Sequence, residues 1–394
     1  MRKSAVLRID KYLSTDKAKA FGLPRWVVKN LLKIGLVKEK TMEYSYFQQR
    51  EINCYERTNK IIEELPYYVQ DFFVGVEMQT SPLTRLNYAY DLRVFFSFLA
   101  AKVFRNKEMQ DIELRDLDML TASDLELYVS YLSFYKINGK TEKCTETGKA
   151  RKLSTLRSFY KYFFNKNMLK ANVAEKVQMP KIHEKEIIRL DSNEKVDEIG
   201  DMLYVVESGS GLTQKQRAFH NSTKLRDTAI ITLFLGTGIR ISELVGLNIE
   251  DFDFNTNSFV VTRKGGNRAV LYYNDDVVKA LSNYLELREN DKNVPEDERA
   301  MFLSLQNKRI ATRTVQELVK KYAKIVSPLK HITPHKLRST FGTNLYRQTG
   351  DIYVVADCLG HKNVETTKKH YAAITEDIRK KAATSLNITG QKND

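Results

Sequence analysis

The sequence predicts a mainly α-helical protein with one small antiparallel β-sheet, arranged as two domains. Apolar residues recur at helical spacing through most of residues 56–180 and again after residue 225. Two runs rich in β-formers flank a Gly-containing turn at 264–267, as in a hairpin. The chain has 394 residues, enough for two or three hydrophobic cores. Residues 171–190 indicate an extended connector broken at Pro180, with 181–190 as the linker.

The first predicted domain, residues 56–180, contains four helices. We expect them at 57–77, 82–104, 121–137 and 146–166, with their aromatic side chains forming the core. Thr121 and Asp124 form a capping signature at the start of the third helix. Residues 1–55 are an N-terminal extension without an assigned role, in which Pro24 opens a short helix that ends near Gly35.

The second predicted domain, residues 191–394, is helical around the small sheet. Residues 205–224 are polar and are expected to form an exposed loop. Strands are expected at 252–261 and 268–273. Helices are expected at 225–235, from Arg240, at 275–288, 312–326, from Pro334, at 351–359, 364–372 and 376–386.

Composition favours a polyanionic partner. The formal net charge is +15, with 64 Lys and Arg against 49 Asp and Glu, so nucleic acid is the first candidate. A basic surface kept for solubility explains the charge equally well. Cys54, Cys144 and Cys358 are far apart and form no CxxC pair, which disfavours a disulfide framework and fits a reducing cytoplasm. We expect neither a signal peptide nor a membrane span.

Residues 333–371 gather the groups needed to attack a phosphodiester. His335 and Arg338 stand three residues apart, His361 follows a Gly, and Tyr371 comes ten residues later. Cations offset charge on phosphorus oxygens, imidazoles move protons or donate hydrogen bonds, and a phenol can become a covalent nucleophile.

With these motifs the sequence resembles tyrosine recombinases of the phage-integrase and Xer type. Within this family it is most similar to the single-recombinase Xer proteins. The shared phrases are Thr-Gly-Ile-Arg240-Ile-Ser-Glu243-Leu, Val-Thr-Arg-Lys264-Gly-Gly, Thr-Pro-His335-Lys-Leu-Arg338 and Leu-Gly-His361. The resemblance covers about residues 60–385 and is specific through the order and spacing of the motifs. It implies a SAM-like helical core-binding domain, followed by a catalytic domain that ends in an exchange helix.

The resemblance implies that two arginines grip the scissile phosphate. Arg240 corresponds to the first and Arg338 to the second, and a planar guanidinium can bond two non-bridging oxygens. Glu243 corresponds to the carboxylate that orients the first arginine. A surface ion pair between Arg240 and Glu243 is the plain alternative, and it is compatible with this role.

The remaining catalytic positions handle protons and the covalent bond. By resemblance Lys264 is the general acid for the leaving 5′ hydroxyl, His335 assists proton transfer from the tyrosine, and His361 bonds the phosphate. Tyr371 is the implied nucleophile. The ten-residue spacing from His361 is one longer than the commonest in the family, and His370 occupies the nine-residue position.

Further basic residues are candidates for DNA contact. A charge series on a helix is usually a solvated face, but in this basic chain the fourth helix is a candidate for phosphate contacts. Arg263 and Arg268 flank Lys264, and an exchange of roles among them stays open. The predicted contacts are Lys149, Arg151, Lys152, Arg157, Arg263 and Arg268.

A competing zinc site would use His331, His335, His361 and His370. Pro334 starts a helix between His331 and His335, so these two are not expected to share a face. No carboxylate stands at ligand spacing either, and we expect no metal and no cofactor.

The implied activity is site-specific recombination of duplex DNA through a 3′-phosphotyrosine and a Holliday junction, by a homotetramer on two sites. The implied role is Xer-type chromosome dimer resolution, linked to chromosome partition and cell division, with an accessory protein left open. Alternatives are the integrase of a mobile element, a relaxing topoisomerase and a catalytically inactive DNA-binding protein.

Overall fold

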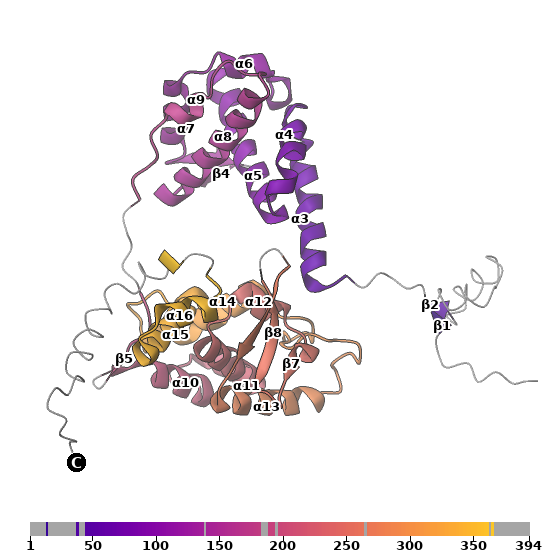
Figure 1. Cartoon of the computed structure of the whole chain (residues 1–394), viewed down its shortest axis with the longest axis vertical. Helices are drawn as coiled ribbons and strands as arrows, with labels where there is room; N and C mark the ends of the chain where they lie inside the picture. Colours follow the sequence, from indigo (N-terminus) through magenta and orange to yellow (C-terminus); the bar gives the residue numbers. More distant parts are fainter. Residues whose placement is uncertain are drawn as a thin grey trace, which may run out of the picture. The chain divides into compact units, whose positions relative to one another are not determined.

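The computed structural model describes residues 13–14, 37–38, 44–137, 139–182, 188–193, 196–263, 266–361 and 364–365. The chain divides into two compact units, Met1–Ile182 and His183–Asp394 (Figure 1). Both are mainly helical, and the second holds a three-stranded antiparallel sheet. The predicted fold class is therefore confirmed.

After residue 44 the regular elements of the first unit are helices, apart from one β-hairpin. Before residue 44, two two-residue strands, β1 (Leu13–Ser14) and β2 (Val37–Lys38), pair in parallel. The elements are α3 (Tyr46–Ile62), α4 (Val69–Val76), η1 (Glu77–Gln79), α5 (Pro82–Phe98), η2 (Leu99–Val103), η3 (Met109–Asp111), α6 (Leu114–Asp118), α7 (Ala122–Tyr131), β3 (Tyr135–Ile137), β4 (Lys140–Glu142), α8 (Glu146–Asn165) and α9 (Val173–Lys176).

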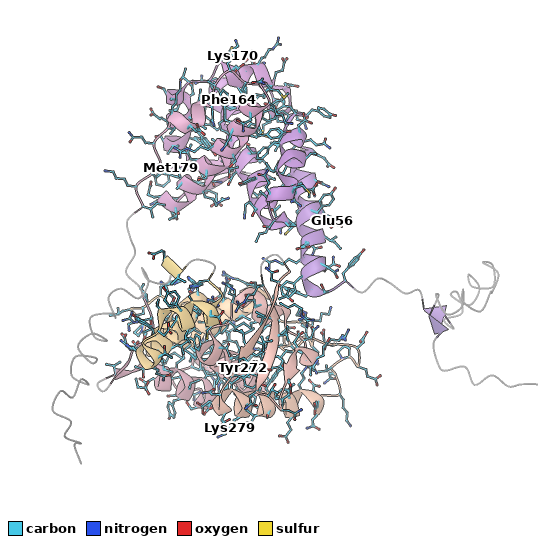
Figure 2. The ribbon with its side chains drawn as sticks, in the orientation of Figure 1. Glu56, Phe164, Lys170, Met179, Tyr272 and Lys279 are labelled. Atoms are coloured by element: carbon cyan, nitrogen blue, oxygen red, sulfur yellow. The ribbon has the colours of Figure 1, made fainter. Side chains whose placement is uncertain are left out.

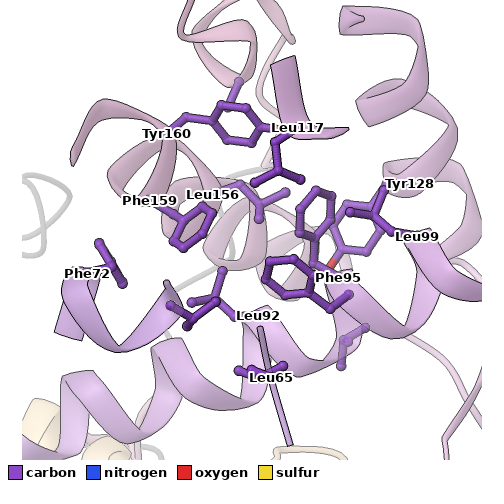
Figure 3. Packing of buried hydrophobic residues seen from close by; sticks show 14 of the residues in the cluster. Leu65, Phe72, Leu92, Phe95, Leu99, Leu117, Tyr128, Leu156, Phe159 and Tyr160 are labelled. Carbon is purple, nitrogen blue, oxygen red and sulfur yellow. The ribbon is translucent and has the colours of Figure 1, made fainter. Parts of the chain in front are cut away.

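Aromatic side chains fill the core of this unit, as the sequence predicted (Figure 3). The Phe72 and Phe159 rings meet edge to face with centroids 5.2 Å apart, and Phe95 meets Tyr128 at the same distance. All four are completely buried. Such pairs add about 0.5–1.5 kcal/mol each beyond the area that they bury. Other aromatic residues remain outside the core, among them Phe164 near the end of α8 (Figure 2).

The predicted helix at 57–77 is wrong as a single element. The chain forms α3 and α4 instead, separated around Pro66. Proline lacks an N–H and its ring clashes with the preceding turn, so a helix does not pass through it. Helix α3 also begins at Tyr46, behind a Ser45 cap, and runs across position 55.

The predicted helix at 121–137 ends early. Helix α7 stops at Tyr131, and β3 and β4 follow as a hairpin in which Ile137 pairs with Lys140. The two residues between them are Asn138 and Gly139, and Asn-Gly is a strong signal for a two-residue hairpin loop. The apolar spacing that predicted a longer helix is therefore interrupted by a hairpin signal.

The second unit places helices around the small sheet (Figure 1). Helix α11 packs against α10, α13 and α15. The elements are β5 (Ser192–Asn193), β6 (Val196–Asp197), α10 (Glu198–Ser208), α11 (Gln214–Thr237), α12 (Ile241–Gly246), η4 (Ile249–Asp251), β7 (Phe252–Asp253), β8 (Ser258–Thr262), β9 (Arg268–Tyr272), α13 (Asp275–Glu289), α14 (Thr312–Val326), α15 (Pro334–Thr349) and α16 (Ile352–Leu359).

The sheet has the order β7-β8-β9, with antiparallel neighbours. Val260 pairs with Val270, and Thr262 pairs with Arg268 at the end of the hairpin. The predicted hairpin is confirmed. The first predicted strand, 252–261, is divided between β7 and β8 by a turn at 254–257.

The predicted loop at 205–224 is wrong. Helix α10 continues to Ser208, and α11 begins directly after Thr213, whose side chain forms a capping box with Gln216. His220 is buried, with Nε2 2.8 Å from the carbonyl oxygen of Val206 on α10. Packing against α10 thus stabilises a helical segment whose composition is polar.

Some predicted elements lie outside the described residues. These are the helix after Pro24, the helix at 376–386 and residues 366–372 of the predicted helix at 364–372. Among the described helices, none combines the length and the apolar character that crossing a membrane requires.

A buried ion cluster joins α5 to α8 in the first unit. Asp91 is 1% exposed, and its carboxylate lies 2.5 Å from Arg151 Nη1 and 2.8 Å from Lys152 Nζ. The Thr155 hydroxyl donates to the same carboxylate at 2.8 Å. Asp91 therefore balances the charge of Lys152, which is itself buried.

We predict that Asp91→Asn lowers the free energy of unfolding of the first unit by about 3 kcal/mol, because it leaves the Lys152 ammonium buried without its carboxylate. Urea unfolding of the full chain measures this. The control is Glu146→Gln, which removes an exposed partner of Lys149 and should change stability by less than about 0.5 kcal/mol. Equal effects of the two changes would contradict the prediction.

Candidate active site

The turn between α11 and α12 sets the position of Arg240. Helix α11 ends at Gly238 in the left-handed conformation, with φ of 61°. A Cβ at this position would lie 2.4 Å from Cδ1 of Phe341, so both the conformation and the space require glycine. Two residues later Arg240 caps the start of α12.

A buried carboxylate orients Arg240. Glu243 is 4% exposed; its Oε1 accepts from Arg240 Nη1 at 2.8 Å and its Oε2 from the Arg240 backbone N–H at 3.0 Å. The Arg240 side chain is 36% exposed. The guanidinium is thus fixed on one side and reaches solvent on the other, where a ligand can approach.

Arg338 lies on α15 and is only 5% exposed. Its Nη1 donates to the carbonyl oxygen of Gly238, and its Nη2 donates to the carbonyl oxygen of Leu359. Arg338 therefore ties the turn before Arg240 to the end of α16.

The two arginines meet at the C-terminus of α16. Arg240 Nη2 donates to the carbonyl oxygens of Leu359 and Gly360 at 3.2 and 3.1 Å, so Leu359 serves both guanidiniums. The last carbonyls of a helix have no partner within it, and this end carries a partial negative charge. The backbone of α16 thereby offsets repulsion between the two cations.

A third guanidinium reaches the same helix end. Arg263 follows strand β8, and its Nη2 lies 3.4 Å from the carbonyl oxygen of Cys358. Arg240, Arg263 and Arg338 thus bring three guanidiniums to this helix end, and the Glu243 carboxylate pairs with Arg240. Guanidiniums such as Arg240 and Arg338 suit an anion with several acceptor oxygens, such as a phosphodiester.

The predicted histidines come from two of these elements. His335 is exposed at the start of α15, three residues before Arg338, and residues at this spacing share a helix face. His361 follows Gly360 directly, and its backbone N–H donates to Ala356 at 2.9 Å. Lys264, His370 and Tyr371 lie outside the described residues, so their roles stay predictions.

Comparison with known proteins decides the family. Residues 211–377 match the phage integrase family, and residues 69–167 match its N-terminal SAM-like domain. A tyrosine recombinase XerC of Caldanaerobacter subterraneus is 36% identical over 296 residues, which cover 73% of this chain and 77% of that protein. The chain belongs to the phage integrase family of tyrosine recombinases.

A second relative matches over its full length. The tyrosine recombinase XerS of Streptococcus pneumoniae is 31% identical over 359 residues, which are 86% of this chain and 100% of that protein. Among solved structures, a XerH site-specific recombinase bound to its difH substrate has a TM-score of 0.57 at 16% identity, covering 77% of this chain and 80% of that chain. This likeness confirms the fold. The chain is a tyrosine recombinase, and its relatives include Xer recombinases. It is therefore a site-specific recombinase.

The thiol nearest the candidate site is not suited to act as its nucleophile. Burial raises the pKa of Cys358, the neighbouring Asp357 carboxylate raises it further, and Arg263 opposes them only in part. The thiol therefore stays protonated near neutral pH, and a thiol is a much weaker nucleophile than a thiolate.

The structure gives two predicted DNA contacts another role. Lys152 is buried against Asp91, and Arg157 donates to the carbonyl oxygens of Ala174 and Val177 at 3.1 and 2.6 Å, which holds α9 against α8. Both side chains have acceptors inside the protein. The charge of a helix, read from its sequence, does not tell which of its Lys and Arg side chains are buried.

The other predicted contacts differ in how much surface they keep. Arg151 is 48% exposed although it bonds Asp91, while Lys149 is paired with Glu146 and its side chain is 12% exposed. Arg268 is exposed at the start of β9, whose other end carries the exposed Tyr272 (Figure 2). Contacts of these residues with DNA stay predictions.

The described residues contain no group of three His, Cys, Asp or Glu side chains that could hold a metal ion. His331 lies before the start of α15 at Pro334, while His335 lies within the helix. The two histidines thus do not share a helical face, as the sequence predicted.

An ion cluster anchors the approach to α15. Lys330 Nζ lies 2.7 Å from Asp191 and 2.6 Å from Glu198, and Ser327 also donates to Glu198. The Leu190 backbone N–H donates to Thr340 on α15 at 3.0 Å. No sequence motif indicates this cluster, which fixes the segment after the connector beside the helix that carries His335 and Arg338.

The cluster shifts the pKa values of its members. Burial alone would raise the pKa of Glu198, but hydrogen bonds from Lys330, Ser327 and the Asp191 backbone bring it below its ordinary 4.5. Burial alone would lower the pKa of Lys330, but Asp191 and Glu198 raise it above 10.5. The stabilisation from Glu198 is therefore present above pH 4.5 and is lost as pH falls through its folded-state pKa. The stabilisation that Lys330 contributes is lost as pH rises above 10.5, through its folded-state pKa.

We predict that Glu198→Gln lowers the free energy of unfolding at pH 7 by about 1–2 kcal/mol, because it weakens charge-assisted hydrogen bonds. The difference from the unchanged protein should shrink as pH falls below 4.5. Urea unfolding at pH 7 and pH 3 measures both. Glu317→Gln, which removes an exposed partner of Arg313, is the control and should have little effect. A difference for Glu198→Gln that is the same at both pH values would contradict the account.

Proposed function

We propose that this protein breaks and rejoins duplex DNA at a specific site through a covalent bond to Tyr371. The observation that supports it best is the convergence of Arg240 and Arg338 on the carbonyl oxygen of Leu359. Two guanidiniums held side by side can offset the charge that builds on the phosphorus oxygens in the transition state.

In the proposed reaction the Tyr371 oxygen attacks phosphorus and loses its proton with help from His335. The bond from phosphorus to the 5′ oxygen breaks, and Lys264 protonates the leaving oxygen. His361 donates a hydrogen bond to the phosphate beside the arginines. The 3′-phosphotyrosine retains the phosphodiester energy, so rejoining by the 5′ hydroxyl of a partner strand requires no ATP and no metal.

In this proposal the two units have different roles in DNA binding and catalysis. The helical unit from residue 44 to about 180 is the core-binding domain, residues 181–190 are the linker, and residues 191–394 form the catalytic domain. A homotetramer acts on two DNA sites in the cytoplasm and forms a Holliday junction. The full-length similarity to XerS supports chromosome dimer resolution as the biological role.

Recovery of covalent protein–DNA adducts tests the function and finds the target. The chain is expressed in a host, denatured without proteolysis and purified, and the attached DNA is sequenced. We expect one short sequence, recurring as a pair of inverted arms. Adducts at a chromosomal site support dimer resolution, adducts at the ends of a mobile element indicate an integrase, and adducts without sequence preference indicate a topoisomerase. Absence of adducts would contradict the proposal.

We predict that Tyr371→Phe abolishes adduct formation on a nicked duplex of the recovered site, because the nucleophilic oxygen is gone. His370→Ala is the matched neighbour and should still form the adduct. Gel mobility of the denatured complex measures both. An adduct with Tyr371→Phe would assign the nucleophile to another residue.

We predict that Glu243→Gln slows adduct formation on the order of 100-fold, since a catalytic guanidinium loses its orientation. The amide keeps the size of the side chain and an acceptor for the Arg240 N–H. Single-turnover rates with saturating DNA measure the effect. Glu250→Gln, which removes an exposed partner of Arg299, serves as control and should retain the full rate.

A further inference from the structure

Arg263 lies with its guanidinium against the last turn of α16. A Cβ added to Gly360 would lie 2.1 Å from Arg263 Nη1 and 2.3 Å from its Cζ, so a side chain at 360 would displace the guanidinium. Gly360 is also left-handed, with φ of 60°, which glycine adopts without strain. The guanidinium therefore lies directly against Gly360.

The backbone of Arg263 forms the base of the turn between β8 and β9. Its N–H donates to the carbonyl oxygen of Asn267 at 2.7 Å, and its carbonyl oxygen accepts from Gly266 at 3.1 Å. The preceding residue, Thr262, pairs with Arg268. A side chain that is fixed at this point therefore fixes the first residue after β8.

The described contacts of the side chain are with the end of α16. Nη2 donates to the carbonyl oxygen of Cys358, the guanidinium lies beside Gly360, and Nε is buried and donates to none of the described residues. Arg240 and Arg263 are both partly buried, but Arg240 is also held by the Glu243 carboxylate. Arg263 thus joins the end of β8 to the end of α16.

We propose that Arg263 is a positioning residue that anchors the β8–β9 turn to the C-terminus of α16. Lys264 is the next residue in the chain, so the anchor fixes the starting point of the general acid relative to Arg240 and Arg338, which bond the same helix end. This inference rests on the proposed function. The positioning role replaces the direct phosphate contact that the sequence predicted for Arg263.

A leaving group that needs no acid tests this role. A 5′ hydroxyl leaves as an alkoxide, a strong base whose conjugate acid is about as weak as water, and it therefore needs a proton. Sulfur in place of the bridging 5′ oxygen leaves as a thiolate, since a thiol has a pKa of about 8.5. Loss of the general acid should therefore slow cleavage of the duplex with bridging oxygen (the oxygen duplex) and not of the duplex with bridging sulfur (the sulfur duplex).

The experiment compares single-turnover cleavage of the recovered duplex with bridging oxygen and with bridging sulfur. Arg263→Ala and Arg263→Gln are the test variants, and the second keeps most of the side-chain volume. Arg299→Ala removes the same charge from an exposed position and is the control. Thermal unfolding confirms that each full-length variant is folded, and DNA affinity is measured in parallel.

We expect both Arg263 variants to cleave the oxygen duplex about 100-fold more slowly, the contribution of a general acid. They should cleave the sulfur duplex at the rate of the unchanged protein, with DNA affinity within about twofold. Slow cleavage of both duplexes, or weaker DNA binding, would overturn the inference in favour of phosphate contact. Full activity on the oxygen duplex would also overturn it. Failure of the unchanged protein on both duplexes would instead refute the proposed function.

Discussion

The carbonyl oxygen of Leu359 is the point on which the candidate site depends. It accepts hydrogen bonds from Arg240 and Arg338, two cations contributed by segments about a hundred residues apart in the chain. Water alone would not hold like charges together. The C-terminus of α16 supplies partial negative charge and acceptors that are already fixed in position. A preorganised pair of guanidiniums results, with no need to rearrange when an anion binds.

Two glycines permit this arrangement. Gly238 ends α11 where Phe341 leaves no space for a side chain, and its carbonyl oxygen receives Arg338. Gly360 ends α16 and leaves space for Arg263. Both adopt the left-handed conformation, and the carbonyl oxygens of Gly238, Leu359 and Gly360 accept hydrogen bonds from the arginines. These arginines are thus positioned by backbone atoms, and the buried Glu243 carboxylate orients Arg240 further.

Local signals made much of the fold predictable. Pro334 opens α15 as expected, and the paired strands flank their glycine turn. The errors arose where local composition and packing disagreed: the polar first half of α11 is helical because His220 packs under α10. In the site, the motifs predicted which two arginines come together. The partners that hold them, the carbonyl oxygens of Leu359 and Gly360, are backbone atoms and leave no trace in residue identity.

The most direct test is a crystal structure of the protein on its recovered duplex, trapped before cleavage by Tyr371→Phe. The account predicts that Arg240 and Arg338 each lie within about 3 Å of non-bridging oxygens of one phosphate. Both should still donate to Leu359. A scissile phosphate that lies away from the end of α16, or arginines that abandon Leu359 to reach it, would contradict the account.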